Sequence, residues 1–341
     1  MKSVRVEDAV GMILCHDITE IVPDLFKGRA FKKGHVIVEQ DIPRLLDLGK
    51  RYVFVSDFEG RVHEDDAARR IAAAACGQGL DLSEPNEGKI TFTARGMGLF
   101  KVRANALEKI NDVQDVMMAT LHTNQTVKPG QGVAGTRIIP LSTEESNILS
   151  VESICKDHFP VIEVKPFMPF EVGMVTTGSE VYTGRIKDGF GPVVREKFRE
   201  LGSQVFRQIL VSDELDMTVG AIHELMAEGA QMIAVTGGMS VDPDDQTPSA
   251  IVAAGGEVVT YGAPVLPGAM FMLAYIGKIP VIGLPGCVMY HKASIFDLVV
   301  PRLLAGEILV RSDILGMGHG GYCSSCKVCR YPLCAFGKEG A

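Results

Sequence analysis

The chain has 341 residues, of which 46% are hydrophobic, and carries a formal charge of −8. This size and apolar content suit two or three domains with buried cores. The acidic charge argues against non-specific nucleic-acid binding, which needs a basic surface. The most apolar stretch, residues 265–284, is interrupted by Lys278, prolines and glycines, so we expect no membrane span. Without a signal-peptide pattern, a cytoplasmic protein is expected.

The first half of the chain reads as short, mixed elements. A strand is expected at residues 4–6, a helix at 7–14, and a helix at 41–48 that ends at Gly49. Helix-forming residues at 65–76 then begin a mixed α+β region that supports, covers or dimerises the rest. In this region Lys128, Arg137 and His122 are candidates for binding a phosphate, or else form a solvated face.

Strands and helices alternate from about residue 166 to 310, beginning with a strand at 172–176. Such an order predicts an α/β fold with a mostly parallel sheet and helices on both faces. Ligands of such sheets bind at the carboxyl ends of the strands. The expected division of the whole chain is an N-terminal α/β segment at 1–60, an α+β insert at 61–165, an α/β domain at 166–310 and a Cys-rich tail at 311–341.

The stretch around Thr236 combines the features of an anion site. A buried strand is expected at 232–235, and Gly237 and Gly238 then allow a sharp turn that a ligand can approach closely. Acidic residues follow, and Thr247-Pro248 is a typical start of a helix. A glycine turn beside a helix N-terminus supplies backbone N–H groups for a phosphate.

Two further glycine turns follow strands and should meet the first one at the same sheet edge. One lies at 177–180 and the other at 284–287. The residues expected to bind the ligand are Thr177, Gly178, Ser179, Glu180, Thr236, Gly237, Gly238, Met239, Ser240, Asp242, Pro285 and Gly286.

The order of these motifs resembles the molybdopterin-binding domain shared by the two enzymes that complete the molybdenum cofactor. One of them adenylylates molybdopterin, and the other inserts molybdate. The resemblance covers about residues 170–306 and rests on TTGSE, TGGMS, the D-x-T-P segment and GLPG. It implies a molybdopterin-binding protein of molybdenum or tungsten cofactor synthesis that forms a homo-oligomer and takes ATP or molybdate as a further substrate.

Two aspartates match the adenylylating branch, Asp188 in a D-x-x-G-P segment and Asp245 in D-x-T-P. In that family both lie at the active site and work with magnesium. The resemblance therefore implies that Asp188 and Asp245 are catalytic and bind Mg²⁺, with Asp242 or Asp244 nearby. Asp213, at the end of another strand, is explained equally well by helix capping or by catalysis.

Other stretches resemble the molybdate-inserting branch, namely GLPG at 283–286 and the N-terminal segments 8–14 and 32–49. The chain departs from both branches. Met239-Ser240 replaces Thr-Gly of the adenylylating enzymes, and Cys287-Val288 replaces Asn-Pro of the inserting enzymes. The pattern indicates a third, hybrid branch.

Two other functions fit the same residues. Gly237 to Thr247 also matches the glycine and aspartate pattern of the competence-damage protein family, which implies a nucleotide pyrophosphatase. A non-catalytic carrier or sensor of molybdopterin would need the same glycine turns. Binding and transfer both require this cradle, so the sequence does not separate them.

Four of the eight cysteines lie close together near the C-terminus in the spacing C-x2-C-x2-C-x4-C. In a cytoplasmic chain this pattern favours metal binding over disulfides. Four thiolates bind one Zn²⁺ or an iron–sulfur cluster, and the tail is also a candidate contact for a protein partner. The expected metal ligands are Cys323, Cys326, Cys329 and Cys334.

Overall fold

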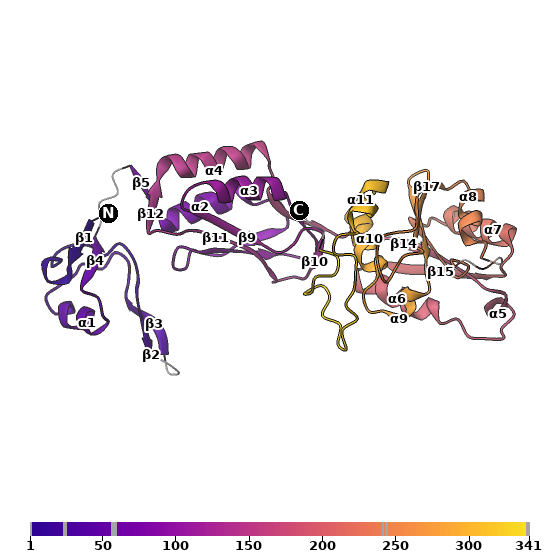
Figure 1. Ribbon diagram of the computed structural model, residues 1–341, viewed down its shortest axis with the longest axis horizontal. Coiled ribbons are helices and arrows are strands. Elements are labelled where there is room, and N and C mark those ends of the chain that lie inside the picture. Colours follow the sequence, from indigo (N-terminus) through magenta and orange to yellow (C-terminus); the bar gives the residue numbers. More distant parts are fainter. Residues whose placement is uncertain (1, 23–25, 56–59, 241, 243–244, 339–341) are drawn as a thin grey trace. The chain divides into compact units, whose positions relative to one another are not determined.

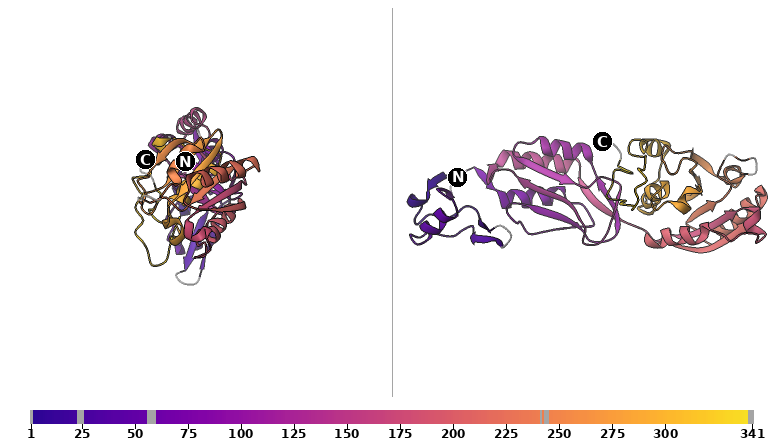
Figure 2. Two further views of the ribbon diagram at one scale, coloured as in Figure 1. Left: turned by 90° about the vertical axis from the view of Figure 1, so that its right-hand side faces the viewer. Right: turned by 60° about the horizontal axis from the view of Figure 1, so that its bottom comes forward.

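The computed structural model forms two compact units (Figures 1 and 2). It describes residues 2–22, 26–55, 60–240, 242 and 245–338. The four-part division expected from the sequence stays a prediction. Unit 1 comprises residues 1–95, 102–121 and 129–163, and unit 2 comprises residues 96–101, 122–128 and 164–341.

Unit 1 begins with small antiparallel strand pairs around a compact apolar core. Strand β1 (Lys2–Arg5) pairs with β4 (Tyr52–Val55), and β2 (Ile18–Val22) pairs with β3 (Phe26–Phe31). Helix α1 (Asp41–Asp47) forms as expected and is followed by Gly49 at φ +74°. The helix expected at 7–14 is wrong. Only a 3₁₀ turn, η1 (Val6–Asp8), forms there, and Gly11 at φ +83° is incompatible with continuing it.

The rest of unit 1 is an antiparallel sheet covered by three helices (Figure 1). Helix α2 (Glu64–Ala75) buries Ala68, Ile71, Ala72 and Ala75 along one stripe, as expected of an amphipathic helix. The strands, in sheet order, are β6 (Leu80–Leu82), β7 (Ile90–Ala94), β11 (Gly132–Ile138) and β9 (Val116–Thr120). The helices are α2 (Glu64–Ala75), α3 (Ala104–Asp112) and α4 (Glu145–Asp157), and a short strand pair joins β5 (Arg61–His63) to β12 (Ser142–Glu144).

Unit 2 is built on a six-stranded sheet, and the α/β fold expected for this region is confirmed. Its first four strands are parallel, and the fifth runs antiparallel to both of its neighbours, which the sequence did not predict. In sheet order the strands are β15 (Gln204–Val211), β14 (Glu171–Thr177), β16 (Met232–Thr236), β19 (Ile279–Leu284), β18 (Met272–Ile276) and β17 (Glu257–Tyr261).

Helices cover both faces of this sheet because alternate strand residues point to opposite sides. Met174 packs into the core beneath helices α6 (Phe190–Glu200) and α10 (Ile295–Leu304). Its neighbour Val175 packs into the opposite core beneath α7 (Leu215–Ala227) and α8 (Thr247–Ala253). The central strands are buried on both sides, as expected of parallel strands.

The remaining elements are short. A three-stranded sheet joins β10 (Gln125–Val127), β8 (Gly98–Val102) and β13 (Ile162–Pro166), and three helices connect loops of unit 2, namely α5 (Ser179–Tyr182), α9 (Cys287–Tyr290) and α11 (Arg311–Gly316). Among the residues that the structure describes, none of the helices has the length and apolar character needed to span a membrane.

Candidate functional site

The three glycine turns leave the sheet of unit 2 at one edge. Thr176 of β14 is in register with Thr236 of β16, and Thr236 is in register with Leu284 of β19. Since the three strands are parallel neighbours, their carboxyl ends lie level with one another. The convergence expected from the sequence is therefore observed.

A cavity of about 520 Å³ opens at this edge. Eight of the predicted site residues line it, namely Thr177, Gly178, Glu180, Asp188, Gly237, Gly238, Asp242 and Asp245. The other predicted residues do not line it, namely Ser179, Thr236, Met239, Ser240, Pro285 and Gly286. Met239 is only 4% exposed and packs into the core, while Asp244 lies outside the described residues.

The turn after β16 is held by helix α8. The carbonyl of Gly237 accepts a hydrogen bond from Thr247 Oγ1 (2.8 Å), and that of Gly238 accepts one from the Thr247 amide (3.2 Å). Both glycines have positive φ, +84° and +54°. A Cβ at Gly237 would collide with the carbonyl of Thr177, so this close approach of two turns requires glycine.

The turn after β14 is held by Asp213. Asp213 accepts a hydrogen bond from the Ser179 amide through Oδ2 (2.8 Å), and Ser179 Oγ lies 3.0 Å from Ser212 Oγ. The N-cap of α7 is Glu214 and not Asp213, so capping of α7 does not explain Asp213. Instead it fixes the first glycine turn and lines the cavity.

Asp188 is fixed at the start of helix α6. Its Oδ1 accepts hydrogen bonds from the amides of Phe190 (2.8 Å) and Gly191 (3.1 Å). Its Oδ2 accepts from Gln208 Nε2 at 2.6 Å. A Cβ at Gly191 would collide with this carboxylate, which explains the glycine of the D-x-x-G-P segment.

Gln208 links Asp188 to the centre of the sheet. Besides Asp188, its Nε2 donates to Thr176 Oγ1 (2.9 Å), which lies 3.0 Å from Thr236 Oγ1. Arg195 Nη2 donates to the side-chain oxygen Oε1 of Gln208 at 3.3 Å. The amide is thus oriented by neighbours on both sides. Gln208 was not predicted as a site residue, because a glutamine within a strand carries no recognisable motif.

Asp245 closes the acidic turn before α8. Its amide donates to the carbonyl of Asp242 (3.0 Å), and its Oδ2 accepts from the Asp242 amide (3.0 Å). These reciprocal bonds hold the Asp245 carboxylate at the rim of the cavity. The other Asp245 oxygen has no partner among the described residues.

The cavity is strongly acidic. Its charged lining consists of five carboxylates and one ammonium, namely Glu180, Asp188, Asp213, Asp242, Asp245 and Lys187. Phe190 and Met289 add an apolar wall, and Met289 of α9 reaches Gly189, where a Cβ would lie 2.9 Å from its Sδ. Lys187, Phe190 and Met289 were not predicted, because they lie between the motifs.

The tail cysteines Cys323, Cys326, Cys329 and Cys334 line one smaller cavity of about 230 Å³, together with His291. Cys326 and Cys329 are exposed, and the other two are partly buried. Within the described part of the chain, no three His, Cys, Asp or Glu residues are placed to hold a metal ion, at the tail or at the sheet edge.

Comparison with known proteins places the sheet-edge cavity in a family context. Residues 173–305 match a family described as "Probable molybdopterin binding domain", and residues 3–57 match one described as a domain of unknown function. A CinA-like protein of Mycobacterium sp. (strain MCS) is 34% identical over 80 residues, which are 24% of this chain and 19% of that protein. The molybdopterin molybdenumtransferase of Staphylococcus aureus (strain COL) is 29% identical over 131 residues, or 36% of this chain and 31% of that protein.

Solved structures match about two fifths of this chain but nearly their own full length. The molybdopterin biosynthesis enzyme MoaB of Thermus thermophilus is 21% identical, with a TM-score of 0.34, over 40% of this chain and 98% of that chain. The tungsten cofactor synthesizing protein MoaB of Pyrococcus furiosus is also 21% identical, with a TM-score of 0.32, over 40% of this chain and 92% of that chain. The residues that match the probable molybdopterin binding domain, 173–305, carry the three glycine turns and both aspartates.

Proposed function

We propose that the sheet-edge cavity binds molybdopterin through its terminal phosphate and catalyses adenylyl or molybdate transfer in molybdenum or tungsten cofactor synthesis. The observation that carries the proposal is the convergence of two glycine turns, at 177–180 and 237–238, and two fixed aspartates, Asp188 and Asp245, on one cavity. A homo-oligomer, with ATP or molybdate as the second substrate, is part of the same proposal.

The turn at Gly237-Gly238 provides donors for the phosphate. Thr247 binds the carbonyls of both glycines. In a trans peptide the carbonyl and the N–H point in opposite directions, so the Gly238 and Met239 amides face away from Thr247. These amides suit a phosphate that approaches the turn from the cavity.

The charge of the cavity calls for a cation to accompany the phosphate. With five carboxylates and one lysine, the lining has a net negative charge, which repels a bare phosphate dianion. Mg²⁺ is commonly bound by one or two carboxylates plus the phosphates of the substrate, not by a complete protein cage. Asp188 and Asp245 suit this role, and the ion would neutralise charge that develops during transfer.

The residues of the chain contribute positioning. Gln208 and the start of α6 hold the Asp188 carboxylate in one orientation, and Asp242 holds that of Asp245. Phe190 and Met289 form an apolar wall suited to the flat face of a pterin ring. A pre-arranged cavity of this kind lowers the entropic cost of aligning two reactants.

Calorimetry with molybdopterin and with its adenylylated form, in the presence of Mg²⁺, tests the proposal. We expect binding at micromolar concentration that a chelator abolishes and that Asp188→Asn weakens. Asp216→Asn, an exposed carboxylate on α7, is the matched control and should bind like the native chain. Absence of binding to both ligands would contradict the proposal.

A nucleotide pyrophosphatase is the second candidate. It is favoured by the 34% identity with a CinA-like protein over 80 residues. Release of AMP from ADP-ribose, lost in Asp245→Asn, would select this activity. Tight binding of molybdopterin without turnover of any nucleotide or molybdate would instead select a carrier or sensor, with the cysteine tail as the contact for a partner.

For the tail we propose a bound metal, Zn²⁺ or an iron–sulfur cluster, at Cys323, Cys326, Cys329 and Cys334. Their common cavity supports this, but the thiolates must draw together to bind one ion. Elemental analysis of the anaerobically purified chain should find zinc, or iron with sulfide. The content should fall in Cys326→Ser and persist in Cys155→Ser, whose thiol is buried in unit 1.

A further inference from the structure

Unit 1 contains a second cavity, of about 540 Å³, to which the glycine turns do not contribute. Segments distant in the sequence form its walls, including the residues around β3, the first turn of α2 and strand β11. Its ionisable lining residues are His16, Asp17, Arg29, Lys32, Lys33, Glu64, Asp65, Glu87 and Arg137. Arg137, a sequence candidate for phosphate binding, lies here, whereas His122 and Lys128 belong to unit 2.

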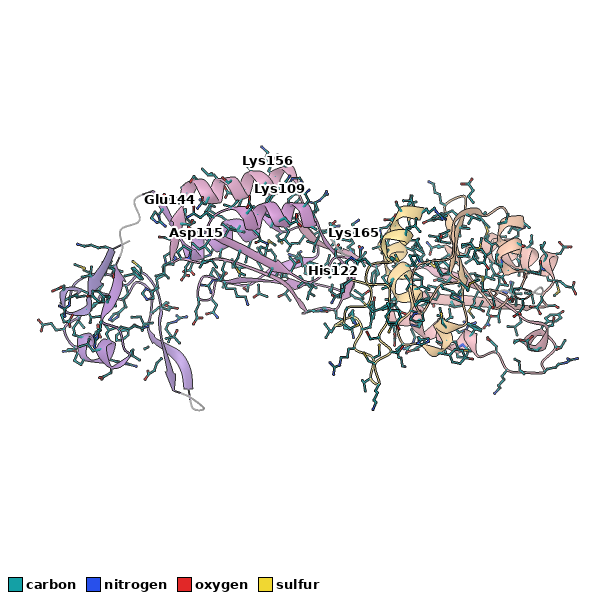
Figure 3. All side chains as sticks on the ribbon, in the orientation of Figure 1. Lys109, Asp115, His122, Glu144, Lys156 and Lys165 are labelled. Atoms are coloured by element: carbon teal, nitrogen blue, oxygen red, sulfur yellow. The ribbon has the colours of Figure 1, made fainter. Side chains whose placement is uncertain are left out.

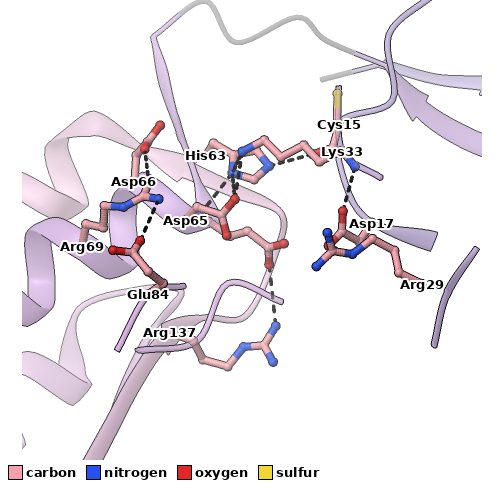
Figure 4. Close-up of polar contacts among 11 residues, drawn as sticks. Cys15, Asp17, Arg29, Lys33, His63, Asp65, Asp66, Arg69, Glu84 and Arg137 are labelled. Carbon is pink, nitrogen blue, oxygen red and sulfur yellow. Dashed lines mark hydrogen bonds and ion pairs between the residues drawn. The ribbon is translucent and has the colours of Figure 1, made fainter. Parts of the chain in front are cut away.

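The carboxylates of this cavity already have partners. Asp17 binds Arg29 Nε at 2.7 Å and the amide of Lys33 at 2.7 Å. Asp65 binds Lys33 Nζ at 2.9 Å, and Glu87 accepts from Thr19 Oγ1 at 3.2 Å. Figure 4 shows Arg29 beside Asp17 and Lys33 reaching toward His63 and Asp65. The acceptors of the lining are therefore largely occupied.

The cationic side chains of the lining, in contrast, still have unoccupied hydrogen-bond donors. Lys32 has no hydrogen-bond or ion-pair partner among the described residues. The guanidinium of Arg29 pairs with Asp17 through Nε, which leaves its Nη groups as further donors. Arg137 donates through Nε to the Ile138 carbonyl, and its Nη2 lies 3.7 Å from Glu64, beyond hydrogen-bond distance. The cavity thus has spare donors from two segments of the chain, the end of β3 and strand β11.

Buried groups fix the floor of the cavity. His63 is 6% exposed, and its Nε2 lies 2.7 Å from the Cys15 carbonyl while Nδ1 lies 2.7 Å from Lys33 Nζ. Glu64 is 7% exposed beside Gly88, where a Cβ would collide with its carboxyl group. His16 Nδ1 is buried without a hydrogen-bond partner among the described residues. Such an atom in a polar cavity is a place for a ligand or water.

We propose that this cavity binds a tetrahedral oxyanion, either free or as the terminal group of a phosphomonoester. Arg29 and Lys32 come from β3 and the turn after it, and Arg137 comes from β11; an anion with three or four acceptor oxygens satisfies them together. The volume falls in the range of small-molecule sites and exceeds that of a bare ion, which favours the phosphomonoester.

Titration calorimetry with inorganic phosphate, molybdate and AMP tests the site. The Asp245→Asn chain in EDTA is used, so that the cavity of unit 2 does not contribute and the outcome is independent of the function proposed there. We expect saturable binding, with AMP tighter than phosphate if the ligand is a monoester and equal to it if the ligand is the free ion. Either result supports the site.

Substitutions locate the binding. Lys32→Met and Arg137→Gln should each weaken the affinity about tenfold through loss of a charge-assisted contact. Lys156→Met, an exposed lysine on α4 (Figure 3), should bind like the parent chain. Lys32 is exposed, so its substitution tests the site even if Arg137→Gln fails to fold. Lack of saturable binding to all three probes, or unchanged affinity in Lys32→Met, would overturn the inference.

Discussion

The cavities of the two units are nearly equal in volume, about 540 Å³ in unit 1 and 520 Å³ in unit 2, but the balance of charge in their linings differs. In unit 1 four carboxylates and four basic side chains share the lining; Asp17, Asp65 and Glu87 accept hydrogen bonds or ion pairs, while Lys32 and two guanidinium groups keep donors to spare. In unit 2 five carboxylates face a single lysine. The groups left unpaired, and not the size of the cavity, therefore indicate which ligand each site binds.

The largest expected effect separates the two cavities by their need for a cation. Asp188→Asn or Asp245→Asn should reduce transfer at the unit 2 cavity about 100-fold or more, because each removes a carboxylate that holds charge at the reacting group. EDTA should have the same effect on the native chain. Oxyanion binding in unit 1 should remain, and its loss in EDTA would show that the two cavities are not independent.

Two glycine substitutions test whether the close approach of the glycine turns forms the unit 2 cavity. Gly237→Ala should abolish pterin binding and lower the free energy of unfolding by about 1–3 kcal/mol, because it places a side chain at φ +84° against Thr177. Gly220→Ala, in helix α7 with open space around it, should instead stabilise the chain by up to about 1 kcal/mol. Chemical denaturation measures both, and equal stabilities would contradict this explanation.

Gln208→Leu should weaken Mg²⁺-dependent binding about tenfold, since loss of an oriented partner of a metal-binding carboxylate typically has this effect. The change, which nearly conserves side-chain shape, removes the amide that donates to Asp188 and to Thr176. Magnesium titration at saturating pterin measures the effect. An unchanged magnesium affinity, with the fold intact, would show that capping by α6 alone orients Asp188.

The sequence predicted the sheet of unit 2 because its signals are local. Apolar runs that end in glycine mark β14, β16 and β19, and these are buried on both faces. Strand β18 was not predicted as a separate strand, although Gly277 and Lys278 form the turn between it and β19. Helix α4 was missed because its apolar residues are sparse, with only Ile148, Val151 and Cys155 buried. Its burial depends on packing against α2 and α3.

The candidate site also contains residues that the sequence predicted and residues that it did not. Asp188 and Asp245 were predicted from motifs, and both line the cavity. Asp213 and Gln208 reach the site from β15 and the loop after it, so their roles follow from the order of strands and not from spacing. The unit 1 cavity was not predicted, because its lining comes from separate stretches between residues 16 and 141.

The smallest expected effect concerns Glu64, the buried acid of unit 1. Burial raises the pKa of Glu64, the negative charge of Asp65 adds to the rise, and Arg137 and Lys33 oppose it. The folded chain therefore holds this proton to higher pH than the unfolded chain does. The free energy of unfolding therefore decreases as pH rises above the pKa of Glu64 in the unfolded chain. The decrease is complete above the pKa of Glu64 in the folded chain.

Glu64→Gln removes this titration. Relative to the native chain, the variant should gain stability as pH rises above the ordinary glutamate pKa, by less than about 1 kcal/mol, as measured by denaturation at each pH. Glu108→Gln, an exposed carboxyl on α3, is the control in the same unit. Because an oxyanion bound near Glu64 favours its neutral form, saturating phosphate should shift the loss of stability to higher pH in the native chain and not in Glu64→Gln. Identical shifts in both chains would show that the anion binds away from Glu64.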